Sequence, residues 1–393
     1  MAGIYRLKGV VKHYDWGGDS FIPALLKTPN KEHQPYAEYW MGTHTSGMAM
    51  VENDADDWHA LGHYDNRLPF LLKVLDVKNM LSIQVHPSKA AAGENFSREN
   101  DAGIAHDAPH RNYKDANHKP ELLVALSDFW LLHGFKPPEE MTYILLNVAE
   151  LRELLPVYNA EGYAGLYKHV MEMPQAEVNR ILRPLVDNLK EVYKEAEPDK
   201  SDEDFWAARA AATFTKGEDI DRGIFSIYLF NLVHLKKGEA MFQDAGVPHA
   251  YLEGQNVEIM ANSDNVLRGG LTSKHIDVPE LLKHVKCEAT FPVIMSGEKL
   301  DNDGQVERIF RTTAPDFQLS VFELEAGNTV SFQPTGTEII LLTEGMVELD
   351  DDENAIKLEP GNPAAVVLGG ETVYIAAAAK STVFRATVPV PQP

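Results

Sequence analysis

The last quarter of the chain, from about residue 290 onward, consists of short apolar or alternating segments that turn residues separate at close spacing. Alternation puts successive side chains on opposite faces of a strand. Several short strands at such spacing are typical of a β-sandwich or barrel. We therefore expect strands at 317–324, 329–333, 338–342, 346–349 and 372–376.

Strand-like segments also recur nearer the N-terminus. Residues 80–86 (MLSIQVH) alternate apolar and polar side chains, which is the period of a strand with one polar face. Other short apolar runs predict further strands at 68–75, 121–126, 129–135, 225–235 and 256–260. The fold class that this pattern predicts is mainly β.

Between Pro137 and about Phe214 the apolar period changes to that of a helix. Apolar residues recur there three and four positions apart, at Val178, Ile181, Leu182, Leu185 and Leu189. Pro184 is expected to bend this helix, or to end one helix and begin another. The sequence therefore predicts a helical insertion between two strand-rich regions.

Charge and composition exclude several classes of protein. The 393 residues include 36 Lys and Arg against 59 Asp and Glu, a formal net charge of −23. An acidic surface repels nucleic acid and anionic membranes, so neither is expected as a partner. The single cysteine, Cys287, permits no intramolecular disulfide, and no run of about 18 apolar residues exists to span a membrane. Residues 1–10 lack the apolar core of a signal peptide. We expect a cytoplasmic protein, and a monomer rather than an oligomer.

Histidines are unevenly distributed along the chain. All 15 lie at or before His284, and the region from Phe291 onward has neither histidine nor cysteine. That region carries 6 Lys and Arg against 16 Asp and Glu, a net charge of −10. A transition-metal site or a phosphate pocket is therefore expected in the first two-thirds of the chain rather than in the last part.

Two short motifs carry candidate metal ligands. Gln84 and His86 are two positions apart on a predicted strand, so both side chains point to the same side and can reach one metal ion. The alternative is the polar outer face of an ordinary strand. The segment 111–121 (RNYKDANHKPE) ends in Glu121 at the entrance of a predicted buried strand. A carboxylate there is a reasonable metal ligand or base, and the alternative is a solvated loop.

The segment 246–274 supplies three more candidates. His249 follows a proline, and in a barrel it would point inward; the alternative is a core histidine bonded to the backbone. Glu258 lies between Val257 and Ile259, so on a strand it faces the other, polar side. Arg268 precedes two glycines in a polar segment expected to be a loop, so the backbone there can approach a ligand closely. The alternative is a surface turn.

Four blocks of sequence together resemble the type I mannose-6-phosphate isomerases, which are zinc aldose–ketose isomerases with a cupin (jelly-roll) core. The blocks are AEYWMGTH, LSIQVHPSK, DANHKPELLVAL and GVPHAYLEGQNVEIMANSDNVLRGGLTSK. They occur in the family's order and match by motif over about the first 290 residues. The resemblance implies interconversion of mannose 6-phosphate and fructose 6-phosphate through an enediol.

The resemblance also implies a domain organisation. Two jelly-roll (cupin) barrels and an α-helical domain are expected. Residues 1–136 and 215–290 would form the catalytic cupin domain, residues 137–214 the helical insertion, and residues 291–393 a C-terminal jelly roll.

The resemblance implies a site as well. One Zn²⁺ per chain would be held by Gln84, His86, Glu121 and His249. One carboxylate and three neutral ligands leave such a site with a net charge of +1 and an open position for substrate oxygen or water. The mixed nitrogen and oxygen ligands suit zinc, although cobalt, nickel or manganese would also fit.

Roles in the reaction follow from its chemistry. Arg268 would stabilise negative charge on the enediolate oxygen. Glu258 is the first choice for the proton carrier, with His118 or a zinc-bound water as alternatives. Lys119 would polarise the sugar oxygens. Because the whole protein is acidic, the phosphate of the substrate needs a local basic pocket, for which further candidates are Lys274, Lys89, Ser82 and Ser88.

Two other functions compete with this one. A non-catalytic cupin could bind a metal and a sugar as a sensor or store, but it has no need for an arginine aimed at developing charge. An iron oxygenase prefers two histidines and one carboxylate with open positions. The predicted Gln84 ligand and the phosphate-binding lysines count against it.

Overall fold

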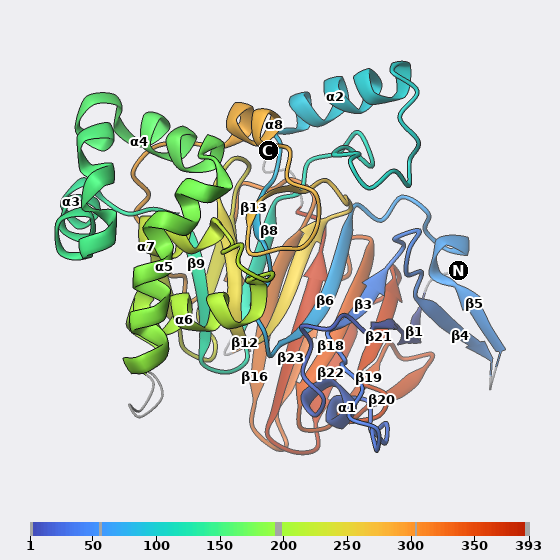
Figure 1. The fold of residues 1–393 in the computed structure, drawn as a ribbon. Coiled ribbons are helices and arrows are strands. Elements are labelled where there is room, and N and C mark those ends of the chain that lie inside the picture. The colour runs from blue at the N-terminus through green and yellow to red at the C-terminus, as the bar shows by residue number, and fades with distance from the viewer. Residues whose placement is uncertain (1–2, 55–56, 193–198, 303–304, 390–393) are drawn as a thin grey trace.

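The computed structural model describes residues 3–54, 57–192, 199–302 and 305–389. It is mainly β, with helices gathered beside the sheets at one end of the molecule (Figure 1). Two large antiparallel sheets and one small one contain the strands. In the part of the chain that the structure describes, no helix is both long enough and apolar enough to cross a membrane.

The ten-stranded sheet carries most of the first two-thirds of the chain. Its strands are β2 (Val10–Lys12), β3 (Glu38–Gly42), β6 (Phe70–Val77), β7 (Ile83–Val85), β8 (Glu121–Ala125), β9 (Phe129–Phe135), β10 (Phe230–Leu235), β11 (Ala240–Gln243), β12 (His249–Ala261) and β13 (Leu267–Gly270). Strand β12 is the longest, with 13 residues, and pairs with β6, β7, β8 and β9. It therefore brings distant segments of the sequence together.

The other two sheets contain the C-terminal strands. The nine-stranded sheet consists of β14 (Glu298–Asn302), β15 (Gln305–Phe310), β16 (Gln318–Leu324), β23 (Ser381–Thr387), β18 (Thr337–Glu344), β21 (Ala364–Leu368), β1 (Ile4–Lys8), β4 (Met50–Asp54) and β5 (Asp57–Ala60). The four-stranded sheet consists of β17 (Thr329–Phe332), β22 (Val373–Ala377), β19 (Val347–Asp350) and β20 (Ala355–Leu358). The five strands expected in this region are all present, within two residues at each end.

Strands from the beginning of the chain complete the sheet formed by its end. Strand β1 pairs antiparallel with β21, with Ile4 opposite Val367. On its other side β1 pairs with β4, and β4 pairs with β5. We expected residues 1–136 and residues 291–393 to belong to different domains. The hydrogen bonding of the first strands does not follow this division, because β1, β4 and β5 join the sheet of the C-terminal strands.

Helices fill the region predicted to be a helical insertion. They are α3 (Pro138–Asn147), the 3₁₀ turn η2 (Ala149–Leu154), α4 (Leu155–Glu172), α5 (Gln175–Val192) and α6 (Glu203–Phe214). The apolar stripe of α5 is buried as expected. The helix does not end at Pro184, which lies on the exposed face, where water can bond the carbonyl that proline leaves unpaired.

One predicted strand is half wrong. Residues 230–235 form β10, but the preceding residues form the helix α7 (Gly223–Leu229). All seven residues of α7 are buried. A helix that is buried on every side shows no amphipathic period, so an apolar run of this length cannot be told from a buried strand.

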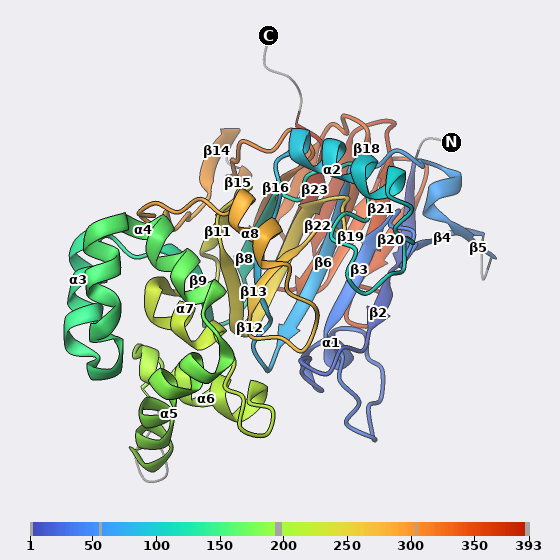
Figure 2. The ribbon, with the colours of Figure 1, turned by 45° about the horizontal axis from the view of Figure 1, so that its top comes forward.

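The remaining helices are short or lie at one end of the sheets. They are α1 (Phe21–Leu25), the 3₁₀ turn η1 (Leu61–His63), α2 (Lys89–Asp101) and α8 (Val278–His284). Helices α2 and α8 lie side by side (Figure 2), joined by an ion pair of 3.1 Å between Arg98 and Glu280.

The core is shared between the sheets and the helices. One apolar cluster packs Leu72 and Val257 of the ten-stranded sheet with Ile339 and Val366 of the nine-stranded sheet. Burial of this contact stabilises both sheets at about 25 cal/mol per Å² of apolar surface. Another cluster joins β7 and β9 to the helices of the insertion. Strand β12 contributes to both clusters, through Ala250 and Leu252 on the helix side and Val257 and Ile259 on the sheet side.

Candidate metal centre

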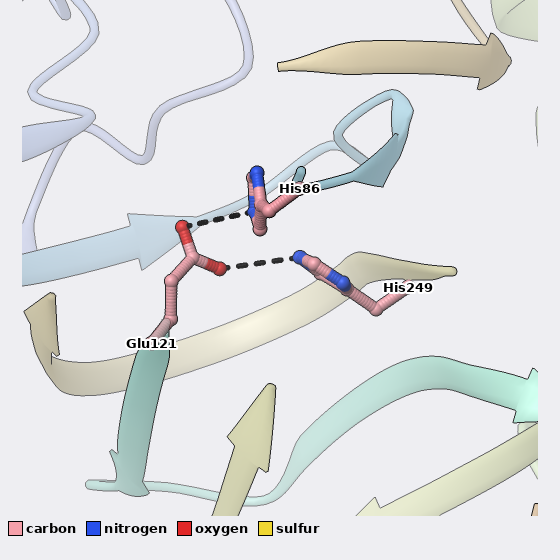
Figure 3. A group of neighbouring side chains, drawn as sticks. All are labelled: His86, Glu121 and His249. Atoms are coloured by element: carbon pink, nitrogen blue, oxygen red, sulfur yellow. Dashed lines mark hydrogen bonds and ion pairs between the residues drawn. The ribbon is translucent and has the colours of Figure 1, made fainter. Parts of the chain in front are cut away.

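Three buried side chains from separate strands converge on one point (Figure 3). His86 follows β7, Glu121 begins β8 and His249 begins β12. The His86 Nε2 atom lies 3.4 Å from Glu121 Oε1, and His249 Nε2 lies 3.2 Å from Glu121 Oε2. Their candidate ligand atoms all lie within 4.8 Å of one another. This is the spacing that one shared cation requires.

Backbone carbonyls fix the tautomer of both histidines. His86 Nδ1 lies 3.0 Å from the carbonyl oxygen of Asn265, and His249 Nδ1 lies 3.0 Å from that of Val247. A carbonyl only accepts hydrogen bonds, so each Nδ1 carries the proton and each Nε2 presents a lone pair. Among the described residues, the buried His86 Nε2 has no hydrogen-bond partner. An unbonded lone pair next to a carboxylate fits a metal ligand.

Electrostatics favours the ligand forms of these groups. Burial, helped by the charge of Lys119, lowers the pKa of His86 to about 4, so its imidazole is neutral near pH 7. Burial opposes ionisation of Glu121, but Lys119 and the two histidines hold the pKa of this carboxyl well below its ordinary value. Two neutral imidazoles and one carboxylate form a donor set that suits Zn²⁺. The residues present therefore fit the metal.

Gln84, the fourth expected ligand, belongs to the same site. Strand pairing places it directly opposite His249 on one side and opposite Arg268 on the other. It also lines the cavity that opens beside the three converging side chains. Gln84 is the middle residue of the three-residue strand β7, and His86 directly follows that strand.

A cavity of about 680 Å³ adjoins the metal centre. Its lining includes eight of the residues expected from the sequence: Ser82, Gln84, Lys119, Glu121, His249, Glu258, Arg268 and Lys274. Such a volume suits a small-molecule ligand. The sequence motifs, which are spread over almost two hundred residues, therefore meet in one place.

Four expected site residues lie outside this lining: His86, which belongs to the metal cluster, and Ser88, Lys89 and His118. Ser88 and Lys89 are exposed at the start of α2, where Ser88 Oγ caps the helix by accepting a hydrogen bond from Ala91 N–H. His118 turns toward the C-terminal sheet, and its Nε2 lies 2.7 Å from Asp316 Oδ2. Proximity along the sequence to the two metal-ligand motifs is thus not enough to place these side chains in the cavity.

The cavity also contains charged groups that the sequence reasoning missed. Lys73, on the fully buried strand β6, donates a hydrogen bond of 3.0 Å to Glu258 Oε1 and lies 3.8 Å from Glu38. Tyr251 donates to the other oxygen, Glu258 Oε2, at 2.8 Å. The signal for Lys73 was one lysine inside an otherwise apolar run, because a charged residue is almost never fully buried without a partner.

Asp264 is a second missed residue. It lines the cavity and lies 3.2 Å from Nε2 of the buried His44. Burial opposes its ionisation, but the contact with His44 and the nearby lysines hold the pKa of Asp264 below its ordinary value. The cavity therefore contains at least three carboxylates, Glu121, Glu258 and Asp264.

Two cations on the cavity wall lack counterions. Within the described ranges, the guanidinium of Arg268 and the ammonium of Lys274 form no hydrogen bond or ion pair. Burial lowers the pKa of both groups, and in Lys274 the charge of Arg268 lowers it further. In a protein with a net charge of −23, two neighbouring unpaired cations mark a site for an anionic ligand.

Comparison with known proteins agrees with this geometry. Residues 4–138 match the family model described as phosphomannose isomerase type I, catalytic domain. The mannose-6-phosphate isomerase of Escherichia coli K12 is 35% identical, over 94% of this chain and 96% of that protein. That of Mus musculus is 31% identical, over 98% of this chain and 96% of that protein.

Solved structures give the same result. The crystal structure of mannose 6-phosphate isomerase from Salmonella typhimurium bound to fructose 6-phosphate and zinc superposes with a TM-score of 0.85. The two sequences are 32% identical, and the superposition covers 99% of this chain and 100% of that chain. A zinc-bound mannose 6-phosphate isomerase superposes with a TM-score of 0.84 at 31% identity.

Proposed function

The chain belongs to the type I phosphomannose isomerase family, and from that membership we propose how its own residues interconvert mannose 6-phosphate and fructose 6-phosphate. The enzyme is an aldose–ketose isomerase, and its cofactor is zinc. One observation carries the proposal. The buried cluster of His86, Glu121 and His249 opens onto a cavity whose wall holds two unpaired cations.

His86, Glu121 and His249 hold the zinc ion, and Gln84 completes the set from the adjacent strand position. The support is the pair of fixed tautomers, which direct both Nε2 lone pairs toward Glu121. When bound there, zinc supplies a Lewis acid that polarises the sugar's oxygen atoms. Lys119 lies against Glu121, so its ammonium can bond a sugar oxygen next to the metal centre.

Lys274 binds the substrate phosphate, and Ser82, which lines the same cavity, offers a hydroxyl. The phosphate carries a charge of about −1.5 to −2 at pH 7, and the ammonium of Lys274 has no other ion-pair partner among the described residues. Arg268 lies in strand register with Gln84 and so stands next to the metal ligands. Its planar set of donors suits the developing charge on the enediolate oxygen.

Glu258 carries the proton between the two carbons. It lines the cavity with only 2% of its surface exposed, and both of its oxygens accept hydrogen bonds, from Lys73 and Tyr251. The ammonium of Lys73, 3.0 Å from Glu258 Oε1, compensates the charge of this buried carboxylate. The two bonds also fix the direction of the carboxylate, which a proton transfer between adjacent carbons on one face requires.

The finer architecture is also a proposal. We infer that the ten-stranded sheet forms one jelly-roll (cupin) barrel and that the nine- and four-stranded sheets form another, with residues 137–214 as a helical domain. Antiparallel pairing throughout the three sheets supports this. We keep the domain limits 1–136 with 215–290, and 291–393, with one change: β1, β4 and β5 pair into the sheet of the second barrel. We also propose a monomeric enzyme acting in the cytoplasm, consistent with a single, unpaired cysteine.

A coupled assay on the purified protein tests this function. Mannose 6-phosphate is supplied, and formation of fructose 6-phosphate is followed, with zinc measured by elemental analysis. We expect one zinc per chain and turnover that stops on chelation and returns with zinc. A protein that binds zinc and sugar phosphate with no turnover would instead be a binding protein.

A further inference from the structure

Asn265 lies at the centre of the site without lining its cavity. It is 0% exposed and lies in the loop between β12 and β13, three residues before Arg268. Its backbone bonds to His86 of the metal centre, and its side chain bonds to residues 114–117, which precede Lys119 and Glu121. Burying an amide is costly unless its polar atoms are bonded, so this degree of satisfaction at one residue points to a specific role.

The backbone of Asn265 orients a metal ligand. Its carbonyl oxygen accepts the 3.0 Å hydrogen bond from His86 Nδ1. That bond fixes the tautomer and the ring direction of His86, leaving Nε2 for the metal. A histidine ligand depends on such a partner for both its orientation and its basicity.

The side chain of Asn265 orients the segment that leads to Lys119. Its Oδ1 accepts from the backbone N–H of Lys114 at 2.7 Å and of Asp115 at 3.3 Å. Its Nδ2 donates at 2.8 Å to the carbonyls of both Asp115 and Asn117. The oxygen of the amide therefore accepts from two backbone N–H groups, and its nitrogen donates to two backbone carbonyls, all within residues 114–117.

That segment needs an external support. Residues 102–120 form neither a helix nor a strand, yet this segment contains Lys119 and leads directly into Glu121. A segment outside helices and strands, with only isolated turn hydrogen bonds, moves unless side chains hold it. Neighbouring contacts add to the same junction, since Asp264 N–H donates to Asp115 Oδ2 at 2.8 Å. Asn265 provides the most bonds across the junction.

We propose that Asn265 is a positioning residue that sets the location of His86 and of the Lys119–Glu121 segment relative to each other. The inference rests on the proposed roles of His86, Glu121 and Lys119. The amide fixes the peptide plane of Asn265 against residues 114–117, and the same peptide holds His86. A shift of the 114–117 segment is thereby coupled to a shift of the histidine on the opposite side of the metal.

The substitution Asn265→Asp tests this with little change in shape. The carboxylate still accepts from Lys114 and Asp115, but it has no N–H group to donate. It would face two carbonyl oxygens and the carboxylate of Asp115, whose Oδ1 lies 3.2 Å from Asn265 Nδ2 in the wild-type protein. We expect turnover to fall about 10–100-fold, with the Michaelis constant changed far less. We also expect zinc to pass from the holoenzyme to a chromogenic chelator several-fold faster, a readout that needs no activity.

Asn112→Ala is the matched control. Asn112 lies in the same segment, and its side chain donates one 2.8 Å bond to Asp277 Oδ2, outside the cavity. If the control loses as much thermal stability and keeps wild-type turnover and zinc release, the effect of Asn265→Asp is one of positioning. If Asn265→Asp does not fold, Asn265→Ser, which keeps a small hydroxyl, replaces it. We then expect Asn265→Ser to have lower turnover and faster zinc release than Asn112→Ala.

Two outcomes would overturn the inference. In the first, the Asn265 variants and Asn112→Ala are equally stable and show the same turnover and the same rate of zinc release. The second is a rise in the Michaelis constant alone. Failure of the proposed function itself would look different, because the wild-type protein would then lack isomerase turnover while zinc release could still be compared.

Discussion

His118 Nε2 lies 2.7 Å from Oδ2 of Asp316, in a contact between residues 198 positions apart. Asp316 stands just before β16 in the nine-stranded sheet, and His118 immediately precedes Lys119. Both side chains are largely buried. The C-terminal part of the chain, which has no histidine and a net charge of −10, therefore touches the segment that carries the cavity's Lys119 and Glu121.

Removing this contact should affect turnover from outside the cavity. Asp316→Ala takes away the acceptor of His118, and a buried hydrogen-bonding group left unpaired costs about 1–3 kcal/mol. We expect a lower melting temperature and turnover reduced by several-fold, with zinc content unchanged. The control is Glu371→Gln, which neutralises an exposed acid in the same part of the chain. Equal turnover and melting in the two variants would show that the contact has no influence on the site.

Metal dependence should follow the ligand set. His249→Ala removes one of the converging Nε2 atoms, so zinc should bind below one equivalent and activity should be lost. His234→Ala is the control, because His234 lies on β10 and pairs with Asp128 outside the cavity. Elemental analysis and the coupled assay measure both variants. Stoichiometric zinc with full activity in His249→Ala would show that the ligand assignment is wrong.

Arg268 should act on turnover rather than on substrate affinity. Loss of a donor that bonds developing charge costs on the order of 100–1,000-fold in turnover. Arg268→Ala should show such a fall with zinc retained, and Arg268→Lys should recover only part of it, since an ammonium lacks the planar set of donors. Steady-state kinetics on variants of known zinc content distinguishes an effect on turnover from an effect on the Michaelis constant. A raised Michaelis constant with near wild-type turnover would make Arg268 a phosphate anchor.

Glu258→Gln should abolish most proton transfer while preserving the shape of the cavity. The amide oxygen can still accept from Lys73, but an amide is not a base, so turnover should fall about 100–10,000-fold. Tyr251→Phe, which removes only the 2.8 Å bond to Oε2, should cost much less. Exchange of substrate protons with solvent, followed by NMR, provides a direct readout. Undiminished exchange in Glu258→Gln would move the role of base to another group.

The acid stability of the enzyme should depend on Glu280. Burial opposes its ionisation, but bonds from Lys283, Tyr113 and His284 lower the pKa of Glu280 to about 2, from an ordinary value of 4.5. The unfolded chain therefore binds a proton at higher pH than the folded chain does. The contribution to stability is complete above about pH 4.5 and is lost as the pH falls toward 2.

Unfolding measured between pH 5 and pH 2 tests this, with Glu280→Gln as the variant. The wild-type protein should lose more stability than Glu280→Gln over this range, because the amide has no proton to bind. Glu177, an exposed acid paired with Arg180, offers a comparison through Glu177→Gln. Parallel curves for wild type and Glu280→Gln would contradict the assignment.

The proposed metal ligands came from the family resemblance of four sequence blocks, because each short motif alone also fits an ordinary strand, a loop or a core histidine; the structure brings three of them, His86, Glu121 and His249, together. Gln84 and His86 are two positions apart, and Glu121 and His249 stand in distinct blocks. Lys73 could not be recognised in this way. It lies within a strand whose other residues are mostly apolar, and only the partner strand, β12, supplies the buried Glu258 that makes a lysine tolerable there.

Long-range pairing was beyond local patterns. Nothing in residues 4–8 distinguishes a strand that pairs with its own neighbours from one that pairs with β21. Likewise Ser88 and Lys89 stand next to a metal-ligand motif, but the capping hydrogen bond of Ser88 starts a helix that carries both away from the cavity. Periodicity reports which face is buried and not which distant segment buries it.

The pairing of β1 with β21 constrains when this protein can fold. On the ribosome, the first strands emerge more than three hundred residues before the strand that they join. Until then the edge of β1 that pairs with β21 stays unpaired, and unpaired strand edges are prone to aggregation. The high sequence separation of this contact also slows folding. Cutting the chain near residue 290 would therefore yield two fragments, each lacking strands that the other carries, and shortening either terminus should destabilise the opposite end of the sequence.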